Sequence, residues 1–236
     1  MRCLSKRAGH LLISSIYWTL WGLFKGIGKS LFRLRFIGQQ HIPAQGRVLI
    51  AANHASLLDI PFLGCGVLRR VAFIGRHDLF PVPFLNSLLQ HLAWIQIRQD
   101  RFDRNGFRHA EALITQGTAV VIFPEGERTE TGEVGEGKPG LATLVAKTNC
   151  VVLPAYISGT YEAIPIGSRR MKFSPVTVLY GRPIDFSERI HLYPKKKDFY
   201  RHVTETVMAA IQDLAARDRK RPTSQEHQCG GKGVLP

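Results

Sequence analysis

The chain has 236 residues, of which 44% are hydrophobic, and this composition suffices for one sizeable core with a small appendage. The four cysteines are widely separated and include no C-x-x-C pair: Cys3, Cys65, Cys150 and Cys229. This spacing argues against a disulfide framework and against a zinc site, and it fits a reducing compartment. The formal net charge of +14 points to an anionic partner, either a membrane or a nucleic acid.

The excess positive charge is unevenly distributed along the chain. Residues 1–35 carry seven lysines and arginines and no acidic residue. Residues 36–194 have sixteen basic and thirteen acidic residues, and residues 195–236 have nine and five. Half of the excess therefore lies at the N-terminus, next to the most apolar segment of the chain. This combination favours an anionic membrane surface, with nucleic acid as the alternative.

The uncharged segment Leu11–Phe24 is rich in bulky apolar side chains, but its fourteen residues are fewer than the about 20 that span a bilayer. Lys25 and Gly26 interrupt it, and its tyrosine and tryptophans are residue types that favour the headgroup region. We expect two short amphipathic helices in a membrane interface within residues 1–34. A signal peptide is disfavoured because no A-x-A-like cleavage site follows, and a buried core helix because bulky residues occur nearly all round. A short tilted span is a further alternative.

From Arg35 onward, strand-like apolar runs alternate with helix-like segments. The expected strands are Arg35–Ile37, Val48–Ala52, Val71–Ile74, Trp94–Ile97, Ala119–Phe123, Val151–Ile157 and Val176–Tyr180. The expected helices are Leu57–Leu68, Pro83–Leu92, Phe107–Thr115 with Asn105 as its cap, Leu141–Lys147, and a final helix over about Lys197–Arg217. The alternation predicts a single α/β domain over residues 35–217, with a mostly parallel central sheet flanked by helices. Residues 218–236 are polar and rich in glycine and proline, and we expect a disordered tail there.

The stretch Val48–Asp59 places a histidine where a buried strand ends. With His54 in the turn and Asp59 in the first turn of a helix, the carboxylate can hold one imidazole nitrogen and leave the other free as a base. The alternative is purely structural. Ser56 and Asp59 match a capping box, in which Asp59 would accept hydrogen bonds from backbone N–H groups and His54 would be an ordinary strand-end histidine.

A second motif follows the apolar strand that ends at Phe123. Pro124 cannot continue a strand ladder, and Gly126 permits close approach of the backbone. Glu125 and Arg128 then emerge at the carboxyl end of the strand, which is where open α/β sheets bind their ligands. Pro-Glu-Gly alone is a common turn, but its combination with the upstream Asn-His-x-x-x-x-Asp is much more specific.

Together the two motifs resemble the signature blocks of the glycerolipid acyltransferases. The segments that carry the resemblance are Asn53-His54-x-x-x-x-Asp59 for the first block, Ile95-Gln96-Ile97-Arg98 loosely for the second, Phe123-Pro124-Glu125-Gly126-x-Arg128 for the third, Val151–Ala155 for the fourth, and Lys138 with Gly140 for the family's Lys-x-Gly. The resemblance covers about residues 35–185, and the N-terminal segment fits the family's membrane-docking element. Glu127 departs from the pattern, because the third block usually has threonine there.

The resemblance implies transfer of a fatty acyl group from acyl-CoA or acyl-carrier protein to the hydroxyl of 1-acylglycerol 3-phosphate, which gives phosphatidic acid in phospholipid synthesis. His54 is then the expected general base, and Asp59 is the group that orients it. The expected substrate-binding residues are Arg98, Glu125, Gly126, Arg128 and Lys138. The arginines suit a phosphate because a guanidinium matches it bidentately. The alternative for each arginine is a surface ion pair, with Glu127 or Asp100 as partner.

The sequence thus predicts an O-acyltransferase at the cytoplasmic face of a membrane, peripheral or monotopic. Its expected partners are the anionic membrane surface, the lysophospholipid and the acyl donor, with no metal, no further cofactor and no nucleic acid. One alternative keeps the chemistry and changes the acceptor to glycerol 3-phosphate or a lyso-ornithine lipid. A second is a non-catalytic basic module that binds nucleic acid or membrane. Phe80, Phe84 and Leu88 are candidates for the wall of an acyl groove and equally for the core.

Overall fold

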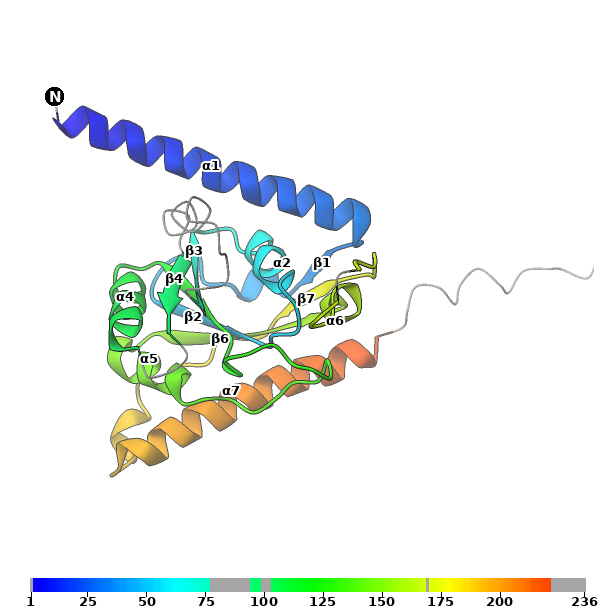
Figure 1. Cartoon of the computed structure of the whole chain (residues 1–236). Coiled ribbons are helices and arrows are strands. Elements are labelled where there is room, and N and C mark those ends of the chain that lie inside the picture. Colours follow the sequence, from blue (N-terminus) through cyan, green and yellow to red (C-terminus); the bar gives the residue numbers. More distant parts are fainter. Residues whose placement is uncertain (1, 77–93, 99–102, 169, 222–236) are drawn as a thin grey trace, which may run out of the picture.

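The strand-like runs of the sequence form a seven-stranded sheet in the computed structural model of the chain, which describes residues 2–76, 94–98, 103–168 and 170–221 (Figure 1). In spatial order the strands are β1 (Arg35–Ile37), β7 (Thr177–Tyr180), β6 (Val151–Ser158), β2 (Val48–Ala52), β5 (Ala119–Ile122), β3 (Val71–Arg76) and β4 (Trp94–Ile97). Neighbouring strands are parallel, except that β6 and β7 are antiparallel. The predicted α/β fold with a mostly parallel central sheet is therefore confirmed.

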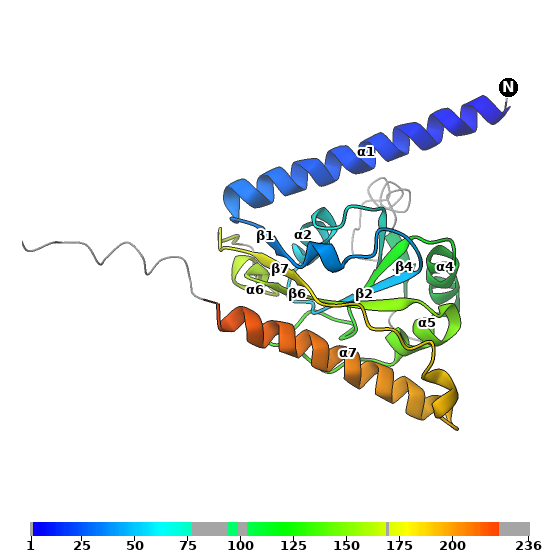
Figure 2. The same ribbon diagram turned by 180° about the vertical axis from the view of Figure 1, so that it is seen from behind.

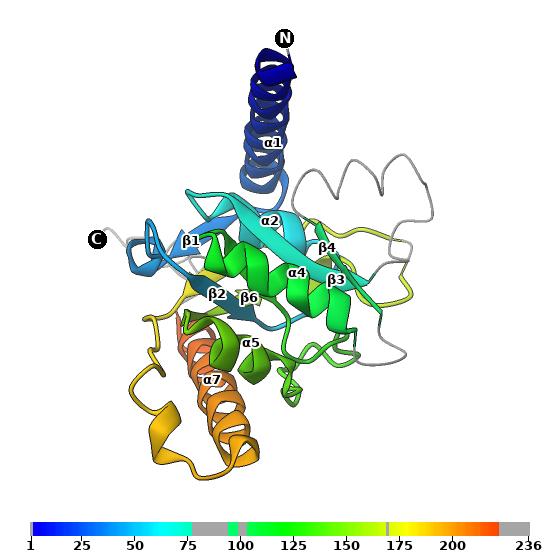
Figure 3. The same cartoon turned by 90° about the vertical axis from the view of Figure 1, so that its left-hand side faces the viewer.

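Helices cover both faces of this sheet. They are α1 (Arg2–Leu31), α2 (Asp59–Cys65), α4 (Arg104–Thr115), α5 (Gly140–Thr148), α6 (Thr160–Ala163) and α7 (Lys196–Arg219), with short 3-10 turns η1 (Gln39–His41) and η2 (Ile190–Leu192). Helices α1 and α2 lie on one side of the sheet, and α5 and α7 lie on the other (Figures 1 and 3). The arrangement has three layers, as the sequence alternation requires.

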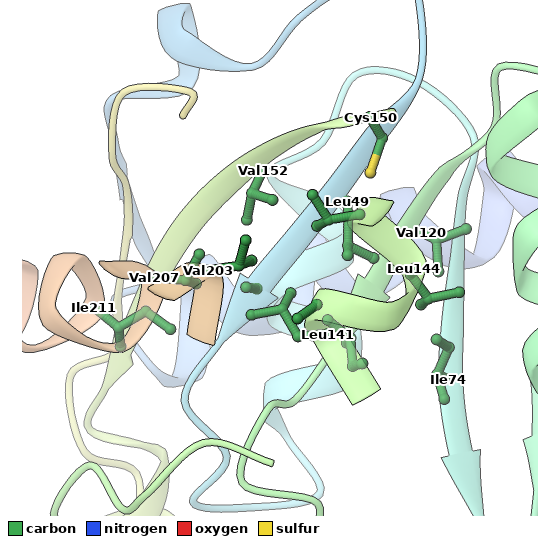
Figure 4. Packing of buried hydrophobic residues seen from close by; sticks show 14 of the residues in the cluster. Leu49, Ile74, Val120, Leu141, Leu144, Cys150, Val152, Val203, Val207 and Ile211 are labelled. Atoms are coloured by element: carbon green, nitrogen blue, oxygen red, sulfur yellow. The ribbon is translucent and has the colours of Figure 1, made fainter. Parts of the chain in front are cut away.

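The central strand β2 is buried along its whole length, because both of its faces are covered. Leu49 and Ala51 point into the cluster formed with α4, α5 and α7, whereas Val48, Ile50 and Ala52 point into the cluster formed with α2 and the end of α1. Figure 4 shows the first cluster, where side chains of the strands meet those of α5 and α7. Full burial of a valine, leucine or isoleucine contributes roughly 1.5–3 kcal/mol, so β2 is firmly fixed as the support of whatever follows Ala52.

The N-terminal segment is one continuous helix, so the prediction of two short helices within residues 1–34 was wrong. The interruption near Lys25 does not end the helix, because a single glycine costs only about 1 kcal/mol in a helix interior. Gly28 also has a packing role. A Cβ there would lie 2.6 Å from Leu34 Cδ2 and 3.1 Å from Phe62 Cε1, so the small residue allows α1 to lie against α2.

The inner side of α1 is bound to the domain by aromatic side chains. The hydroxyl of Tyr17 accepts a hydrogen bond from Val71 N at 3.0 Å, and the ring of Trp21 lies over Gly64, where a Cβ would be 2.4 Å from the indole. The large apolar side chains that α1 leaves exposed form its outer face, and they are Ile16, Trp18, Leu23, Phe24, Ile27 and Leu31. Within the described part of the chain, no helix combines the length and apolar character needed to cross a membrane.

Several predicted boundaries shift. Helix α2 ends at Cys65 rather than Leu68, because the chain turns at Gly66, where a Cβ would lie 2.2 Å from Tyr180 Oη. Asp103, not Asn105, caps α4, since its carboxylate accepts hydrogen bonds from the N–H groups of Asn105 and Gly106.

Helix α7 continues to Arg219, two residues into the segment predicted to be a disordered tail. Asp218 is held there because its carboxylate accepts a 2.6 Å hydrogen bond from Ser158 Oγ. The predicted helix Pro83–Leu92 and the candidate groove residues Phe80, Phe84 and Leu88 lie outside the described residues.

Candidate active site

The structure brings His54 and Asp59 together at the carboxyl end of β2. The imidazole Nδ1–H of His54 donates a hydrogen bond of 2.9 Å to Asp59 Oδ2. The Asp59 side chain is 0% exposed and the His54 side chain 14% exposed, so the carboxylate is sealed in while the ring still reaches the surface. Among the described residues, Nε2 of His54 has no hydrogen-bond partner. The imidazole therefore presents one nitrogen for proton transfer, as the sequence predicted.

The same carboxylate oxygen also holds the turn between β2 and α2. Asp59 Oδ2 accepts hydrogen bonds from Ala55 N at 2.7 Å and from Ser56 N at 2.8 Å. The structural role predicted as the alternative for Asp59 is therefore present, and the same oxygen also holds the imidazole; the catalytic role of the pair stays a prediction. Asp59 Oδ1 is buried and has no hydrogen-bond partner in the described part of the structure.

The loop that follows β5 clamps His54 from the other side. Phe123 stacks on the imidazole with ring centroids 4.0 Å apart and planes 13° apart. The N–H of His54 donates to Glu125 Oε1 at 3.0 Å, and its carbonyl accepts from Thr129 N at 2.8 Å. Both backbone groups and one ring face of His54 are therefore fixed by the second motif and by Thr129, which directly follows it. This contact explains why the two motifs occur together.

Asn53 is a positioning residue that sequence reasoning did not assign. Its side-chain Nδ2 donates to the carbonyl of Ile157 at 3.0 Å, and its Oδ1 accepts from Ile157 N at 2.8 Å. The amide thus continues the pairing of β2 with β6 by one step beyond the ladder. A polar residue placed directly after an entirely apolar strand is the signal that indicates such a role.

Glu125 braces two loops from a buried position. Its second oxygen, Oε2, accepts a hydrogen bond from Gly135 N at 3.1 Å, so both oxygens are engaged by backbone N–H groups. Burial raises the pKa of its carboxyl, and the hydrogen bonds from His54 and Gly135 act in the opposite direction. Glu125 thus holds the turn after β2 against the loop around Gly135, and its part in substrate binding stays a prediction.

Arg128 lies one residue before Thr129, whose N–H is bonded to the carbonyl of His54. Its side chain is half-buried and forms no ion pair with any described residue. The ion-pair alternative with Glu127 does not hold, because Glu127 pairs with Lys138 at 3.2 Å. Arg128 is therefore the basic side chain that the loop carries closest in sequence to the His54 contact.

Gly126 and Lys138 lie together on the outer side of this loop. Gly126 has a φ of 78°, so the backbone favours glycine there, and a Cβ would lie 2.9 Å from the flexible side chain of Lys138. Lys138 is exposed and paired with Glu127, and its backbone N–H donates to the carbonyl of Pro124 at 2.7 Å. Its part in substrate binding stays a prediction.

The structure does not place Arg98 beside His54. Arg98 follows β4, and β3 and β5 lie between β4 and β2. Three strand spacings correspond to roughly 14 Å. The sequence could not reveal this separation, because it predicts strands but not their order in the sheet. Asp100, the ion-pair partner considered for Arg98, lies outside the described residues.

Two other side chains near the site are not nucleophiles. Burial raises the pKa of the Cys65 thiol to about 12, so the thiol stays protonated at neutral pH. Ser56 Oγ donates to the carbonyl of Ile164 at 3.1 Å. The described residues contain no cluster of three or more histidine, cysteine, aspartate or glutamate side chains that could hold a metal ion.

A histidine–aspartate pair therefore lies at the carboxyl edge of the parallel strands, next to the loop of the second motif. The sequence model of the acyltransferase family matches residues 33–158, which include the pair and the whole second motif up to Arg128. The chain therefore belongs to the acyltransferase family, and the resemblance found in the sequence is confirmed.

Individual relatives agree with this assignment. A chloroplastic 1-acyl-sn-glycerol-3-phosphate acyltransferase of Arabidopsis thaliana is 26% identical over 162 residues, which are 66% of this chain and 45% of that protein. The 1-acyl-sn-glycerol-3-phosphate acyltransferase of Bacillus subtilis is 22% identical over 77% of this chain and 87% of its own length. The crystal structure of the 1-acyl-sn-glycerophosphate acyltransferase PlsC of Thermotoga maritima matches with a TM-score of 0.72 and 26% identity, over 89% of this chain and 83% of that one. The chain spans about half the length of the plant relatives it matches.

The brace formed by Glu125 gives a first prediction. In Glu125→Gln, one of the two backbone N–H groups faces an amide NH₂ in place of an oxygen. We expect the free energy of unfolding to fall by about 1–3 kcal/mol, because a buried donor is left without an acceptor. Denaturant unfolding followed by circular dichroism measures this. Glu127→Gln is the matched control, and its exposed ion pair should be worth less than about 1 kcal/mol. Equal stability of the two variants would contradict the brace.

Proposed function

We propose that this chain transfers a fatty acyl group from a thioester to the hydroxyl of 1-acylglycerol 3-phosphate, giving phosphatidic acid. The observation that carries the proposal is the buried Asp59 carboxylate holding Nδ1 of His54, with the Arg128 loop bonded to the carbonyl of the same histidine. Membership of the acyltransferase family supports the reaction class, and the names of the relatives support the acceptor.

In the proposed reaction His54 acts as general base. The acceptor hydroxyl gives its proton to Nε2 while its oxygen attacks the thioester carbonyl carbon, and collapse of the tetrahedral intermediate breaks the C–S bond. The imidazolium then returns the proton to the leaving thiolate. Asp59 keeps the proton on Nδ1 and stabilises the imidazolium, and a positioned base of this kind contributes roughly 10²–10⁴-fold. No covalent acyl-enzyme is required, because the thioester is already activated.

Arg128 supplies the positive charge for the phosphate of the acceptor. In 1-acylglycerol 3-phosphate, the phosphate is separated from the reacting hydroxyl only by glycerol carbons, so its binding group must lie close to the base. Arg128 meets this requirement because the next residue, Thr129, donates its backbone N–H to the carbonyl of His54. A guanidinium suits the task because it can donate two parallel hydrogen bonds to phosphate oxygens.

The proposed site of action is an anionic membrane surface on the cytoplasmic side. The exposed apolar outer face of α1 supports this, because such a face with basic residues beside it is the pattern of an interfacial helix. Lys29 and Arg33 are exposed at its end. The segment before β7 lies next to that end (Figure 2), and Phe173, which is 61% exposed, contacts Phe32 there. The buried, unpaired thiols of Cys65 and Cys150 fit a reducing compartment.

Substitution of the base tests the reaction directly. In His54→Ala, acyl transfer to 1-acylglycerol 3-phosphate should fall by about 10²–10⁴-fold because the proton acceptor is lost. In Asp59→Asn the rate of acyl transfer should fall by a similar factor, because the amide NH₂ favours the ring tautomer with the proton on Nε2. Thioester consumption and phosphatidic acid formation are measured together. His191→Ala, in the exposed turn η2, serves as control. Turnover of His54→Ala at the control's rate would refute the mechanism.

An acceptor panel tests the role of Arg128. Arg128→Ala should lose about 100-fold of its kcat/KM with 1-acylglycerol 3-phosphate, because the phosphate loses charge-assisted hydrogen bonds. With a monoacylglycerol, which has no phosphate, the change should be small. The matched control is Arg189→Ala, an exposed arginine next to η2. A preference of the wild-type chain for a lyso-ornithine lipid would show that 1-acylglycerol 3-phosphate is not its acceptor. If Arg128→Ala lost the same factor of kcat/KM with both acceptors, Arg128 would not bind the phosphate.

The membrane surface is tested with vesicles. Leu23, 56% exposed on the outer face of α1, is replaced by serine, and Leu192, 73% exposed on η2, is replaced as control. Leu23→Ser should bind vesicles that contain phosphatidylglycerol about tenfold more weakly, because an apolar side chain no longer enters the bilayer. Leu192→Ser should bind like the wild type. Cosedimentation measures the binding, and equal affinity of both variants would exclude the outer face of α1 as the contact.

A further inference from the structure

The connection between α6 and β7 carries a second group of exposed apolar side chains. Met171 and Phe173 are each more than half exposed, and Ile166 earlier in the same connection is exposed as well. Apart from Leu68 and Leu192, the large apolar side chains that are exposed in the described part of the chain lie on α1, in the turn after β2 or in this connection. Exposed apolar surface that is gathered in this way marks a contact site.

This connection lies at the same edge of the sheet as His54. Strand β6 is parallel to β2, so the chain leaves β6 at the carboxyl edge, and it enters the antiparallel β7 from that edge, with Ser158 opposite Thr177. Strand β1 is parallel to β7, so the end of α1, which leads into β1, lies there too (Figures 1 and 2). The end of α1, the connection and His54 are therefore on one side of the molecule.

Two contacts join the connection to the end of α1. The N–H of Val176 donates a 2.8 Å hydrogen bond to the carbonyl of Phe32. The ring of Phe173 meets the ring of Phe32 edge-on with centroids 5.4 Å apart, and Phe32 in turn packs on Phe62 at 5.1 Å. Phe173 is therefore exposed but already fixed in place, so its insertion into another phase needs little further loss of side-chain entropy.

The other end of the connection is joined to the turn of His54. The carbonyl of Ile164 accepts a 3.1 Å hydrogen bond from Ser56 Oγ, and the N–H of Ser56 donates to Asp59 Oδ2. The N–H of Lys172 donates to the carbonyl of Ala163 at 2.9 Å, which returns the chain to the end of α6. A surface that holds residues 171–173 is thus coupled to the turn of His54 by a short series of hydrogen bonds.

The charge around these apolar side chains is positive. Arg170 and Lys172 are exposed on either side of Met171, and Arg33 is exposed at the end of α1. Residues 163–176 include no acidic residue, and the nearest in sequence is Glu162 on α6. Arg33 has a φ of 47°, which glycine adopts at lower cost, and a strained residue of this kind points to a role for its side chain.

We propose that residues 171–173 form a second lipid contact, in which Met171 and Phe173 enter an anionic bilayer while Lys172, Arg170 and Arg33 contact lipid phosphates. The inference rests on the proposed function and deepens it by a contact separate from the outer face of α1. Apolar side chains flanked by cations complement a membrane surface, which has an apolar interior below negatively charged head groups.

The second contact fixes the orientation of the domain on the membrane. Helix α1 alone would leave the domain free to rotate about the helix axis. A contact beside the end of α1, at the carboxyl edge of the sheet, removes this freedom and turns that edge toward the lipid. His54 then faces the surface in which a lysophospholipid acceptor lies.

A fluorescent label at residue 171 tests the insertion directly. Met171→Cys is labelled with an environment-sensitive fluorophore in the full chain, with Cys3 and Cys229 replaced by serine. With vesicles of phosphatidylglycerol and phosphatidylcholine, its emission should shift to shorter wavelength and be quenched by a quencher on the lipid acyl chains. The control is Leu68→Cys, an exposed position where the chain enters β3 at the opposite edge of the sheet. An unchanged spectrum at 171, or an equal change at 68, would overturn the proposal.

Cosedimentation with the same vesicles measures the apolar contribution. The double variant Met171→Ser and Phe173→Ser should bind about tenfold more weakly, because two apolar side chains no longer leave water. Leu68→Ser should bind like the wild type. If Leu23→Ser weakened binding and the double variant did not, α1 would be the membrane contact by itself and the inference would be refuted.

The basic side chains are tested by lipid charge. The double variant Arg170→Gln and Lys172→Gln should bind vesicles that contain phosphatidylglycerol about tenfold more weakly, and this difference should disappear at high salt. Lys195→Gln with Lys197→Gln, at the exposed beginning of α7, is the matched control and should bind like the wild type. Equal affinities of the two double variants would exclude lipid phosphates as the partners of Arg170 and Lys172.

Acyl transfer by the wild-type chain to a short-chain, monomeric 1-acylglycerol 3-phosphate is measured in parallel. Insertion of residue 171 without acyl transfer would refute the proposed function alone. Acyl transfer without insertion of residue 171 would refute the second lipid contact alone.

Discussion

The site depends on one carboxylate oxygen. Asp59 Oδ2 accepts hydrogen bonds from the His54 ring and from two consecutive backbone N–H groups, so the turn that follows β2 and the imidazole are fixed by the same atom. Its burial removes water as a competing donor and strengthens each of these bonds. A group that holds both the backbone and the base cannot orient one without the other. The structural and the chemical roles of Asp59 are therefore inseparable in this chain.

The order of the strands determines which residues hold the turn that carries His54. Strands β5 and β6 are the two neighbours of β2, and each fixes a residue of the turn at its own carboxyl end. The loop after β5 contributes Phe123 and Glu125, whereas the end of β6 binds Asn53 through Ile157. Strand β4 lies at the far edge, so Arg98, which follows it, is separated from His54 by roughly 14 Å.

Much of this could be predicted from the sequence, where local rules apply. Apolar runs located the strands, and the spacing of His54 and Asp59 indicated a pair, because a turn followed by a helix brings those positions together. Family resemblance identified the loop of Arg128. The continuity of α1 does not follow from local patterns, because Lys25 and Gly26 resemble a helix break, whereas Gly28 permits a close contact with α2. The stacking of Phe123 on His54 and the position of Arg98 depend on strand order, which local patterns do not contain.

The central claim is that Asp59 holds the proton of the His54 imidazole on Nδ1 and leaves Nε2 free to accept one. Nitrogen-15 NMR of histidine-labelled chain measures this directly, because the two ring nitrogens have distinct shifts when one is protonated and the other is not. When the ring is neutral, Nδ1 should carry the proton and Nε2 should be unprotonated in the wild-type chain. A proton on Nε2 of the neutral ring would contradict it, because the nitrogen that faces the substrate would then have no capacity to act as the base.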